Sequence, residues 1–154
     1  MTSKSSSQDL RARMEATARA LISAFEEGGD HEDPSLVNRD VTPDCTRHLL
    51  PVSLLEAFGM PADYIFDNAS FQATYARDLK ALRFKNNVIS HLVIDTETRM
   101  ASFVAKAEIC PLEGDAYPYE QTWTLYFNDD GTKVKKVIEF CDKEGLLRKA
   151  SASA

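Results

Sequence analysis

Hydrophobic residues recur at two different spacings along the chain, and the spacing changes near Phe84. In residues 8–27 they fall every three or four positions, as on one face of an amphipathic helix: Leu10, Met14, Ala18, Leu21, Ile22 and Phe25. Gly28 and Gly29 follow, and we expect them to end this helix. The first part of the chain is therefore predicted to be helical.

Two further helices are expected before Phe84. A short one follows Asp33-Pro34, because proline suits the first helical turn and the preceding acid can cap it. A third is capped by Asp67 or Asn68, and its apolar residues are four and three positions apart: Phe71, Tyr75, Leu79 and Leu82. The pattern predicts three helices in all.

The segment between the second and third helices is less regular. Pro43-Asp44-Cys45 breaks the helical pattern, and residues 46–50 are predicted to form a short strand that Pro51 closes. Residues 52–67 are apolar but follow no period, so they are expected to form a lid or the rim of a pocket.

From Phe84 onward the hydrophobic period is two, which is typical of strands. Strands are expected near 86–95, 99–111, 116–127 and 133–142. Three helices followed by a four-stranded antiparallel meander predict an α+β fold with the helices packed on one face of the sheet. If the sheet curls around the helices, it encloses a cone-shaped apolar cavity.

The outer face of this sheet is expected to form a homodimer interface. Phe103 and Ile109 alternate with residues that face the helices, so we expect them on that outer face. An apolar outer face would be covered by a second copy of the chain.

The last two predicted strands form a hairpin that runs from Tyr117 to Asp142. The turn Asn128-Asp129-Asp130-Gly131 suits a three-residue hairpin loop, which would pair Asn128 with Thr132. This register places Glu139 opposite Gln121, Val137 opposite Trp123 and Cys141 opposite Tyr119. One face would then carry Tyr117, Tyr119, Gln121, Trp123, Val137, Glu139 and Cys141.

Glu139 is the leading catalytic candidate. Its strand is apolar on both faces, so a carboxylate there is expected to be buried and partnered rather than exposed at a strand end. Burial would raise its pKa and allow it to act as a general acid or base near neutral pH. Tyr117 is expected to donate a hydrogen bond to a substrate oxygen, although tyrosines more often only pack.

Other polar residues are weaker candidates. His48 is one of three histidines and would carry protons, with a surface role as the commoner alternative. Arg39 or Arg47 would orient a carbonyl or stabilise an enolate, and a solvent-facing ion pair is the alternative for each. The cavity walls are expected to include three residues of the hairpin: Tyr119, Gln121 and Trp123.

Composition narrows the class of protein. The 154 residues suffice for one domain, expected at 8–142 between a disordered segment 1–7 and an exposed tail 143–154. A net charge of −6 argues against nucleic-acid and anionic membrane partners. The three cysteines lack metal-binding spacing and no run is long enough to span a membrane, so a reducing, cytoplasmic location without a metal is expected.

The order of elements resembles the nuclear-transport-factor-2-like (NTF2-like) superfamily, and within it the SnoaL-like polyketide cyclases. It looks most like small fungal members of natural-product pathways, such as meroterpenoid ring-rearranging isomerases and the brevianamide semipinacolase. The matching motifs are Asp44-Cys45 followed by Pro51, Tyr117, the acidic turn of residues 127–131, and Glu139-Phe140-Cys141-Asp142. The resemblance implies catalytic roles for Tyr117, Glu139 and a pocket arginine, and no cofactor. Gln121 stands where a second tyrosine is often found.

These patterns predict an enzyme that isomerises, cyclises or rearranges a hydrophobic polycyclic compound. One alternative is a dehydratase or epoxide hydrolase of the same fold, which would need two pocket histidines, for which His48 and His91 are available, or an Asp/Arg/Asp array. The other is a non-catalytic binding module of the same superfamily, which a filled pocket or a solvent-facing Glu139 would favour.

Overall fold

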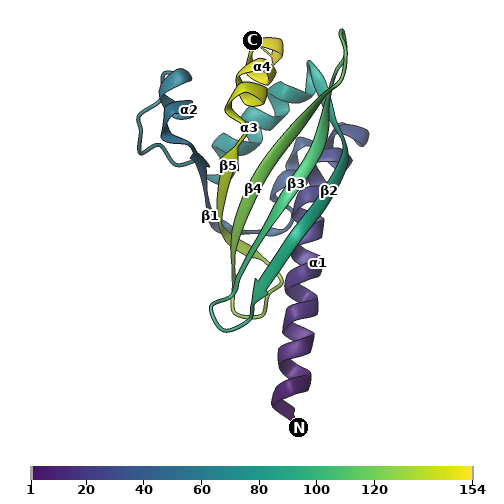
Figure 1. Cartoon of the computed structure of the whole chain (residues 1–154), viewed down its shortest axis with the longest axis vertical. Helices are drawn as coiled ribbons and strands as arrows, with labels where there is room; N and C mark the ends of the chain where they lie inside the picture. Colours follow the sequence, from purple (N-terminus) through teal and green to yellow (C-terminus); the bar gives the residue numbers. More distant parts are fainter. Residues whose placement is uncertain (1, 154) are drawn as a thin grey trace.

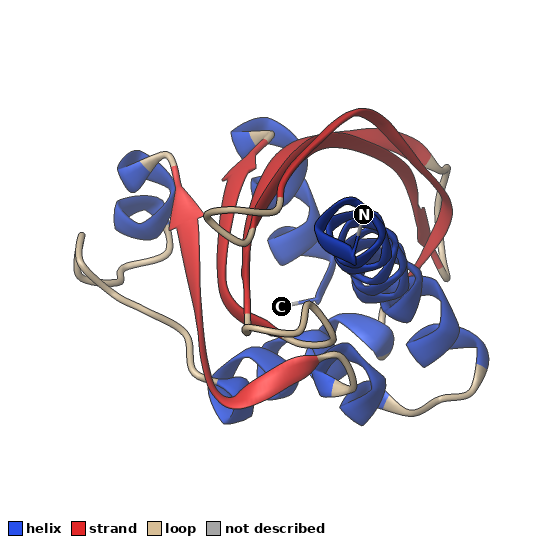
Figure 2. Ribbon diagram, turned by 90° about the horizontal axis from the view of Figure 1, so that it is seen from below, coloured by secondary structure: helices blue, strands red, loops and turns tan. Residues whose placement is uncertain are grey.

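The computed structural model describes residues 2–153, with side chains described at residues 6–152. A curved five-stranded sheet wraps around one long helix (Figure 1, Figure 2). The elements in chain order are α1 (Thr2–Asp30), η1 (Pro34–Asn38), β1 (Val41–Leu50), α2 (Val52–Ala57), α3 (Asn68–Leu79), β2 (Leu82–Asp95), β3 (Met100–Pro111), β4 (Tyr117–Phe127), β5 (Val134–Cys141) and α4 (Lys143–Ser153). The predicted α+β class is confirmed.

The sheet has the strand order β1-β5-β4-β3-β2. Its last four strands form the predicted antiparallel meander, and β1 adds a fifth strand that is parallel to β5. The two edge strands, β1 and β2, do not pair with each other, so the curved sheet stays open on one side (Figure 2). The concave face of the sheet holds α1.

Strand β1 is longer than predicted, because it takes in Pro43-Asp44-Cys45 as well as residues 46–50. Its pairing with β5 shifts between Val41 and Thr46, where β1 has more residues than its partner. An edge strand with a bulge tolerates Pro43, since the missing N–H removes no hydrogen bond from the sheet.

Helix α1 supplies the centre of the core. Its apolar stripe, which includes Met14 and Leu21, is fully buried against the concave face of the sheet. The helix runs from Thr2 to Asp30, longer at both ends than the predicted 8–27. The expected disordered segment 1–7 includes Met1, which lies outside the described residues, as does Ala154 at the other end.

The predicted N-terminal caps of η1 and α3 are confirmed. The Asp33 carboxylate accepts a hydrogen bond from the Ser35 N–H at 3.0 Å, and Asp67 accepts one from the Ser70 N–H at 2.7 Å. Helix α3 ends at Leu79, and Leu82 begins β2 instead of continuing the helix.

Residues 143–154 were expected to be an exposed tail, and this is wrong for the described part, which forms helix α4. The Asp142 carboxylate accepts a hydrogen bond from the Gly145 N–H at 3.1 Å, so it caps the helix. A Cβ at Gly145 would lie 3.0 Å from the ring of Tyr119, so glycine lets α4 approach β4 closely. Leu146 is buried as a result.

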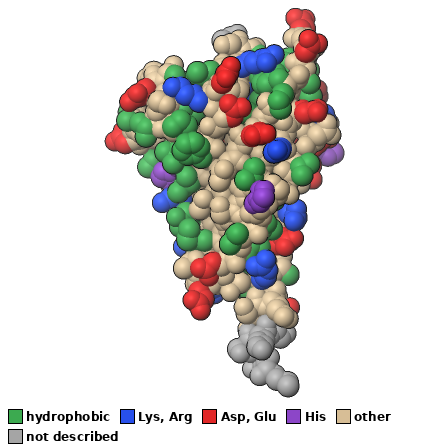
Figure 3. Space-filling model, viewed as in Figure 1, with side chains coloured by type: hydrophobic (Ala, Val, Ile, Leu, Met, Phe, Trp, Pro, Cys, Tyr) green, Lys and Arg blue, Asp and Glu red, His purple; other side chains and the backbone are tan. Residues whose placement is uncertain are grey.

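The assignment of Phe103 and Ile109 to the outer face is also wrong. Both are buried on the concave face, because Phe103 pairs across the strands with Trp123 and stacks on it. The outer face instead exposes Val88, Val93 and Phe140. Figure 3 views the molecule from this side and shows further hydrophobic side chains gathered over α2 and the segment that follows it.

None of the described helices is long and apolar enough to cross a membrane.

Candidate active site

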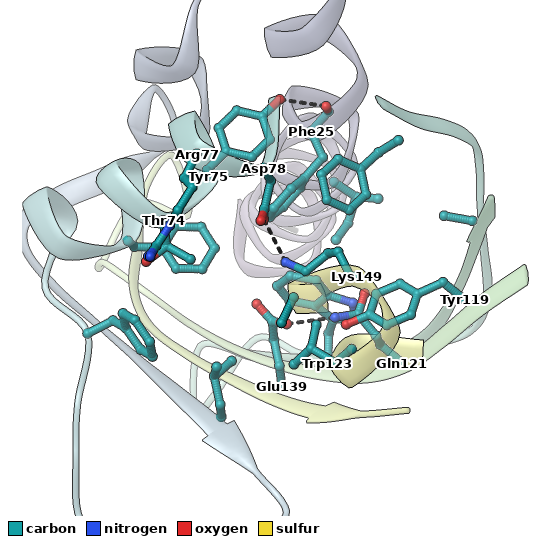
Figure 4. Close-up of a pocket in the computed structure, with 18 of the residues that line it drawn as sticks. Phe25, Thr74, Tyr75, Arg77, Asp78, Tyr119, Gln121, Trp123, Glu139 and Lys149 are labelled. Atoms are coloured by element: carbon teal, nitrogen blue, oxygen red, sulfur yellow. Dashed lines mark hydrogen bonds and ion pairs between the residues drawn. The ribbon is translucent and has the colours of Figure 1, made fainter. Parts of the chain in front are cut away.

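A cavity of about 300 Å³ lies between the sheet and the helices α1, α3 and α4 (Figure 4). Its wall includes a group of aromatic side chains from α1, α3, β2 and β4: Phe25, Phe71, Tyr75, Phe84, Tyr119 and Trp123. Phe25 lies at the centre of this wall, with its ring edge-on to Phe71, Tyr75, Phe84 and Trp123. Such a cavity suits an apolar ligand with a few polar groups.

Glu139 of β5 points into this cavity and is only 4% exposed. The Gln121 amide donates a hydrogen bond to its Oε2 at 2.6 Å (Figure 4). Its Oε1 is buried and has no hydrogen-bond partner among the described residues. Burial raises the pKa of Glu139, and the positive charges of Arg47 and Lys149 oppose that rise. The predicted buried carboxylate is therefore present, with one oxygen available to a ligand.

The hairpin register differs from the prediction by two residues. Glu139 is opposite Trp123, and Gln121 is opposite Cys141. The loop is longer than expected, because the Asn128 N–H bonds to the Lys133 carbonyl, and a bulge adds a further residue beside Tyr126. A shift of two leaves every side chain on the predicted face, so Gln121 still reaches Glu139 diagonally.

Arg47 of β1 is completely buried but does not itself line the cavity. Its Nη2 donates to the Val37 carbonyl at 2.7 Å, and its guanidinium carbon lies 3.9 Å from the centre of the Phe71 ring. Within the described part of the chain, its Nε and Nη1 find no hydrogen-bond partner. Its charge acts on Glu139, whereas Arg77 of α3 lines the cavity itself.

Arg39 and His48, by contrast, lie outside the cavity. Arg39 follows η1 and forms ion pairs with Glu27 at 2.7 Å and Asp40 at 3.1 Å on the surface. His48 is adjacent to Arg47 on β1, so strand alternation turns it to the outer face, where its Nε2 lies 3.2 Å from Thr46 Oγ1. Burial and Lys136 lower the pKa of His48. These positions speak against catalytic roles for both residues.

Of the two hairpin tyrosines, Tyr119 lines the cavity and Tyr117 does not. The ring of Tyr117 is covered by the Arg148 guanidinium, 4.0 Å from its centre, at the end of β4 near α4. Burial raises the pKa of Tyr119 well above its usual value, and the neighbouring Cys141 and Glu139 add to the rise. Its phenol is therefore held in the neutral form, which can donate a hydrogen bond.

The structure adds an ion pair that the sequence interpretation missed. Lys149 of α4 and Asp78 of α3 both line the cavity, and their Nζ and Oδ2 atoms are 2.6 Å apart (Figure 4). Their side chains are 13% and 7% exposed. Asp78 had a signal in the sequence, since it falls three residues after Tyr75 on the apolar stripe of its helix. Lys149 had none, because the sequence predicts an exposed tail after Asp142.

Among the described residues, no group of three or more His, Cys, Asp or Glu side chains could hold a metal ion.

Comparison of sequences finds no match to a known family model and none to a curated protein. Solved structures do match. The BvnE pinacolase of Penicillium brevicompactum is 20% identical with a TM-score of 0.76, over 93% of this chain and 95% of that one. AusH of Aspergillus nidulans is 23% identical with a TM-score of 0.69, over 86% and 85%.

An NTF2-like protein from Burkholderia pseudomallei is 10% identical with a TM-score of 0.65, over 91% of this chain and 98% of its own. At these identities the likeness shows the fold, and the predicted NTF2-like fold is confirmed.

Proposed function

We propose that the protein is an enzyme of secondary metabolism that isomerises, cyclises or rearranges a hydrophobic polycyclic compound by acid/base catalysis without a cofactor. The observation that carries this proposal is Glu139, a carboxylate in an aromatic cavity whose Oε1 lacks a hydrogen-bond partner among the described side chains and backbone groups. Buried polar atoms without a partner are rare in folded proteins, and a ligand would supply the partner.

Glu139 would carry the proton. Its Oε2 is held by the hydrogen bond from Gln121, so Oε1 is the atom that would take a proton. That proton would come from a carbon next to a carbonyl, or from the hydroxyl of an alcohol whose neighbouring group migrates. The raised pKa of the carboxyl makes its ionised form a stronger base for taking that proton. The Tyr119 hydroxyl would donate a hydrogen bond to the substrate, in the role first assigned to Tyr117.

The shape of the aromatic wall would determine which product forms. Phe25, Phe71 and Trp123 confine a ring system to few orientations, and orientation decides which of several competing rearrangements occurs. The name of BvnE as a pinacolase is consistent with a skeletal rearrangement in a cavity of this fold.

The two alternatives find less support. A two-histidine dehydratase site would need His48 and His91 in the cavity, and no histidine is among the described residues that line it. A non-catalytic module was expected to show a filled pocket or an exposed Glu139. The cavity instead has about 300 Å³ of space and holds Glu139 inside.

The test is to replace Glu139 by Gln in the source organism and compare its metabolites by mass spectrometry. An isomerase predicts that the accumulated compound has the same elemental composition as the lost product, because a rearrangement changes no atoms. A dehydratase predicts a compound one water heavier. Glu144→Gln on the exposed side of α4 is the control, and an unchanged profile in E139Q would refute the proposal.

Purified protein then tests cofactor independence. After dialysis against a chelator, it is expected to convert the accumulated compound with nothing added. A requirement for an added metal or organic cofactor would contradict this part of the proposal.

We also propose a homodimer through the outer face of the sheet, now placed at Val88, Val93 and Phe140, which are 60%, 65% and 55% exposed. Phe140→Glu is expected to halve the mass measured by light scattering. Leu112→Glu, at an equally exposed residue next to β3, is the control. A monomeric wild-type protein would contradict the proposal.

A further inference from the structure

The Asp78–Lys149 ion pair lies in the same cavity as Glu139, on the side formed by α3 and α4 (Figure 4). Leu146, Lys149 and Ala150 are three and four residues apart on α4, so one face of this helix meets the cavity. Buried Leu146 and the close approach at Gly145 fix that face. The Lys149 side chain is therefore directed inward, although a lysine near a helix end usually extends to water.

A role in holding α4 against α3 is a poor explanation for this ion pair. Moving two charges out of water costs free energy that their attraction often does not repay, and apolar side chains of similar size would hold α4 to α3 as well. The ammonium also lies within electrostatic reach of Glu139. The cavity thus holds the Lys149 ammonium together with the candidate base, among aromatic side chains and a few other polar ones that include Arg77.

We propose that Lys149 is the residue that binds the reacting oxygen of the substrate, with Asp78 holding its side chain in place. An ammonium group has three N–H donors, so it can bond to Asp78 and to a ligand oxygen at the same time. The inference rests on the proposed function, since it takes this cavity as the substrate site. It specifies the substrate as a hydrophobic ring compound that carries a carbonyl or carboxylate oxygen.

In an enolisation the two groups would act together. Glu139 removes a proton from the carbon next to the carbonyl, the C–H electron pair forms a carbon–carbon double bond, and the carbonyl π pair moves to oxygen. The resulting enolate oxygen accepts a hydrogen bond from Lys149, which stays protonated throughout. The oxygen pair then re-forms the carbonyl, and the carbon–carbon double bond takes the proton back from the protonated Glu139. This occurs at the same carbon on its other face or, in a substrate with a conjugated double bond, at the γ-carbon, so that the double bond moves. Donors directed at a developing oxyanion in a water-poor site contribute strongly to rate.

Ligand binding tests this without any turnover. Trp123 is the only tryptophan of the chain and lines the cavity, so its fluorescence reports on occupancy. Three bicyclic probes share one ring skeleton and differ in the polar group at C2: decalin has none, 2-decalone has a carbonyl and decalin-2-carboxylate has a carboxylate. We expect the wild-type protein to bind the carboxylate most tightly and decalin least tightly at pH 7.5.

Lys149→Met keeps the length of the side chain and removes its charge. It is expected to weaken carboxylate binding about 10- to 100-fold, the range of a hydrogen bond to a charged group, and to leave decalin binding unchanged. Lys143→Met, on the same helix but outside the cavity wall, is the matched control. If K149M is poorly folded, the double variant D78N/K149M leaves no unpaired charge and takes its place.

Two results would overturn the inference. One is a wild-type protein that shows no preference for the oxygen-bearing probes. The other is a Lys149 variant that binds decalin and the carboxylate as the wild type does, which would leave the ion pair a purely structural role. Neither result depends on the metabolite test of Glu139, so the two proposals can fail separately.

Discussion

Replacing Glu139 by Gln is expected to change how the stability of the protein depends on pH. Burial raises the pKa of this carboxyl above its ordinary value of 4.5 in the folded state. Between 4.5 and the raised value, the unfolded chain has released the proton while the folded protein still holds it. The free energy of unfolding of the wild type therefore falls as the pH rises through this window.

The size of the effect follows from the single proton involved. A difference of one bound proton corresponds to a slope of about 1.4 kcal/mol per pH unit. For a chain of this length, that slope lowers the Tm by about 3–6 °C per pH unit within the window. The charges of Arg47 and Lys149 narrow the window without changing the sign.

The assay is thermal unfolding followed by circular dichroism between pH 4 and pH 8. The Tm of the wild type is expected to fall relative to that of E139Q as the pH rises, because the amide cannot release a proton. The other ionisable groups are common to both proteins and cancel in the difference. Glu144→Gln should follow the wild type. Parallel curves for the wild type and E139Q would refute the raised pKa.

Two further predictions compare matched residues. Gly131 and Gly59 have φ angles of 75° and 72°, but a Cβ at Gly131 would lie 2.8 Å from a Met14 side-chain atom, while none lies within 4 Å at Gly59. Gly131→Ala should therefore cost about 1–3 kcal/mol more than Gly59→Ala in urea unfolding, and equal costs would contradict the packing of the hairpin turn on α1. Tyr119→Phe should lower kcat on the compound that accumulates in E139Q at least about tenfold, and Tyr117→Phe should not. A larger loss of kcat in Tyr117→Phe than in Tyr119→Phe would assign the hydrogen bond to the substrate to Tyr117.

Much of the fold could be predicted from the local spacing of hydrophobic residues in the sequence. The three-and-four spacing predicted α1 and α3, and the spacing of two predicted β2 to β5 to within a few residues, because each spacing reports which side of an element is buried. The same alternation placed Glu139 and Gln121 on one face. That conclusion survived a register error of two residues, since an even shift leaves the faces unchanged.

Features that depend on distant partners could not be predicted in this way. The full length of β1 depends on its parallel pairing with β5, nearly a hundred residues later in the chain. Helix α4 packs closely on Tyr119 of β4, and its Lys149 meets Asp78 of α3. Neither contact leaves a periodic signal in the segment itself.

The sequence by itself determined α1, η1, α3 and the four strands of the meander, their order, and the buried carboxylate at Glu139. Only the tertiary structure decided which buried residues meet around the cavity, bringing in Asp78 and Lys149 and leaving out His48 and Tyr117. The physical reason is that periodicity reports whether a side chain faces inward. Which inward-facing side chains meet is set by the curvature of the sheet and the seating of α1, α3 and α4 on it, and these arise from contacts between distant parts of the chain.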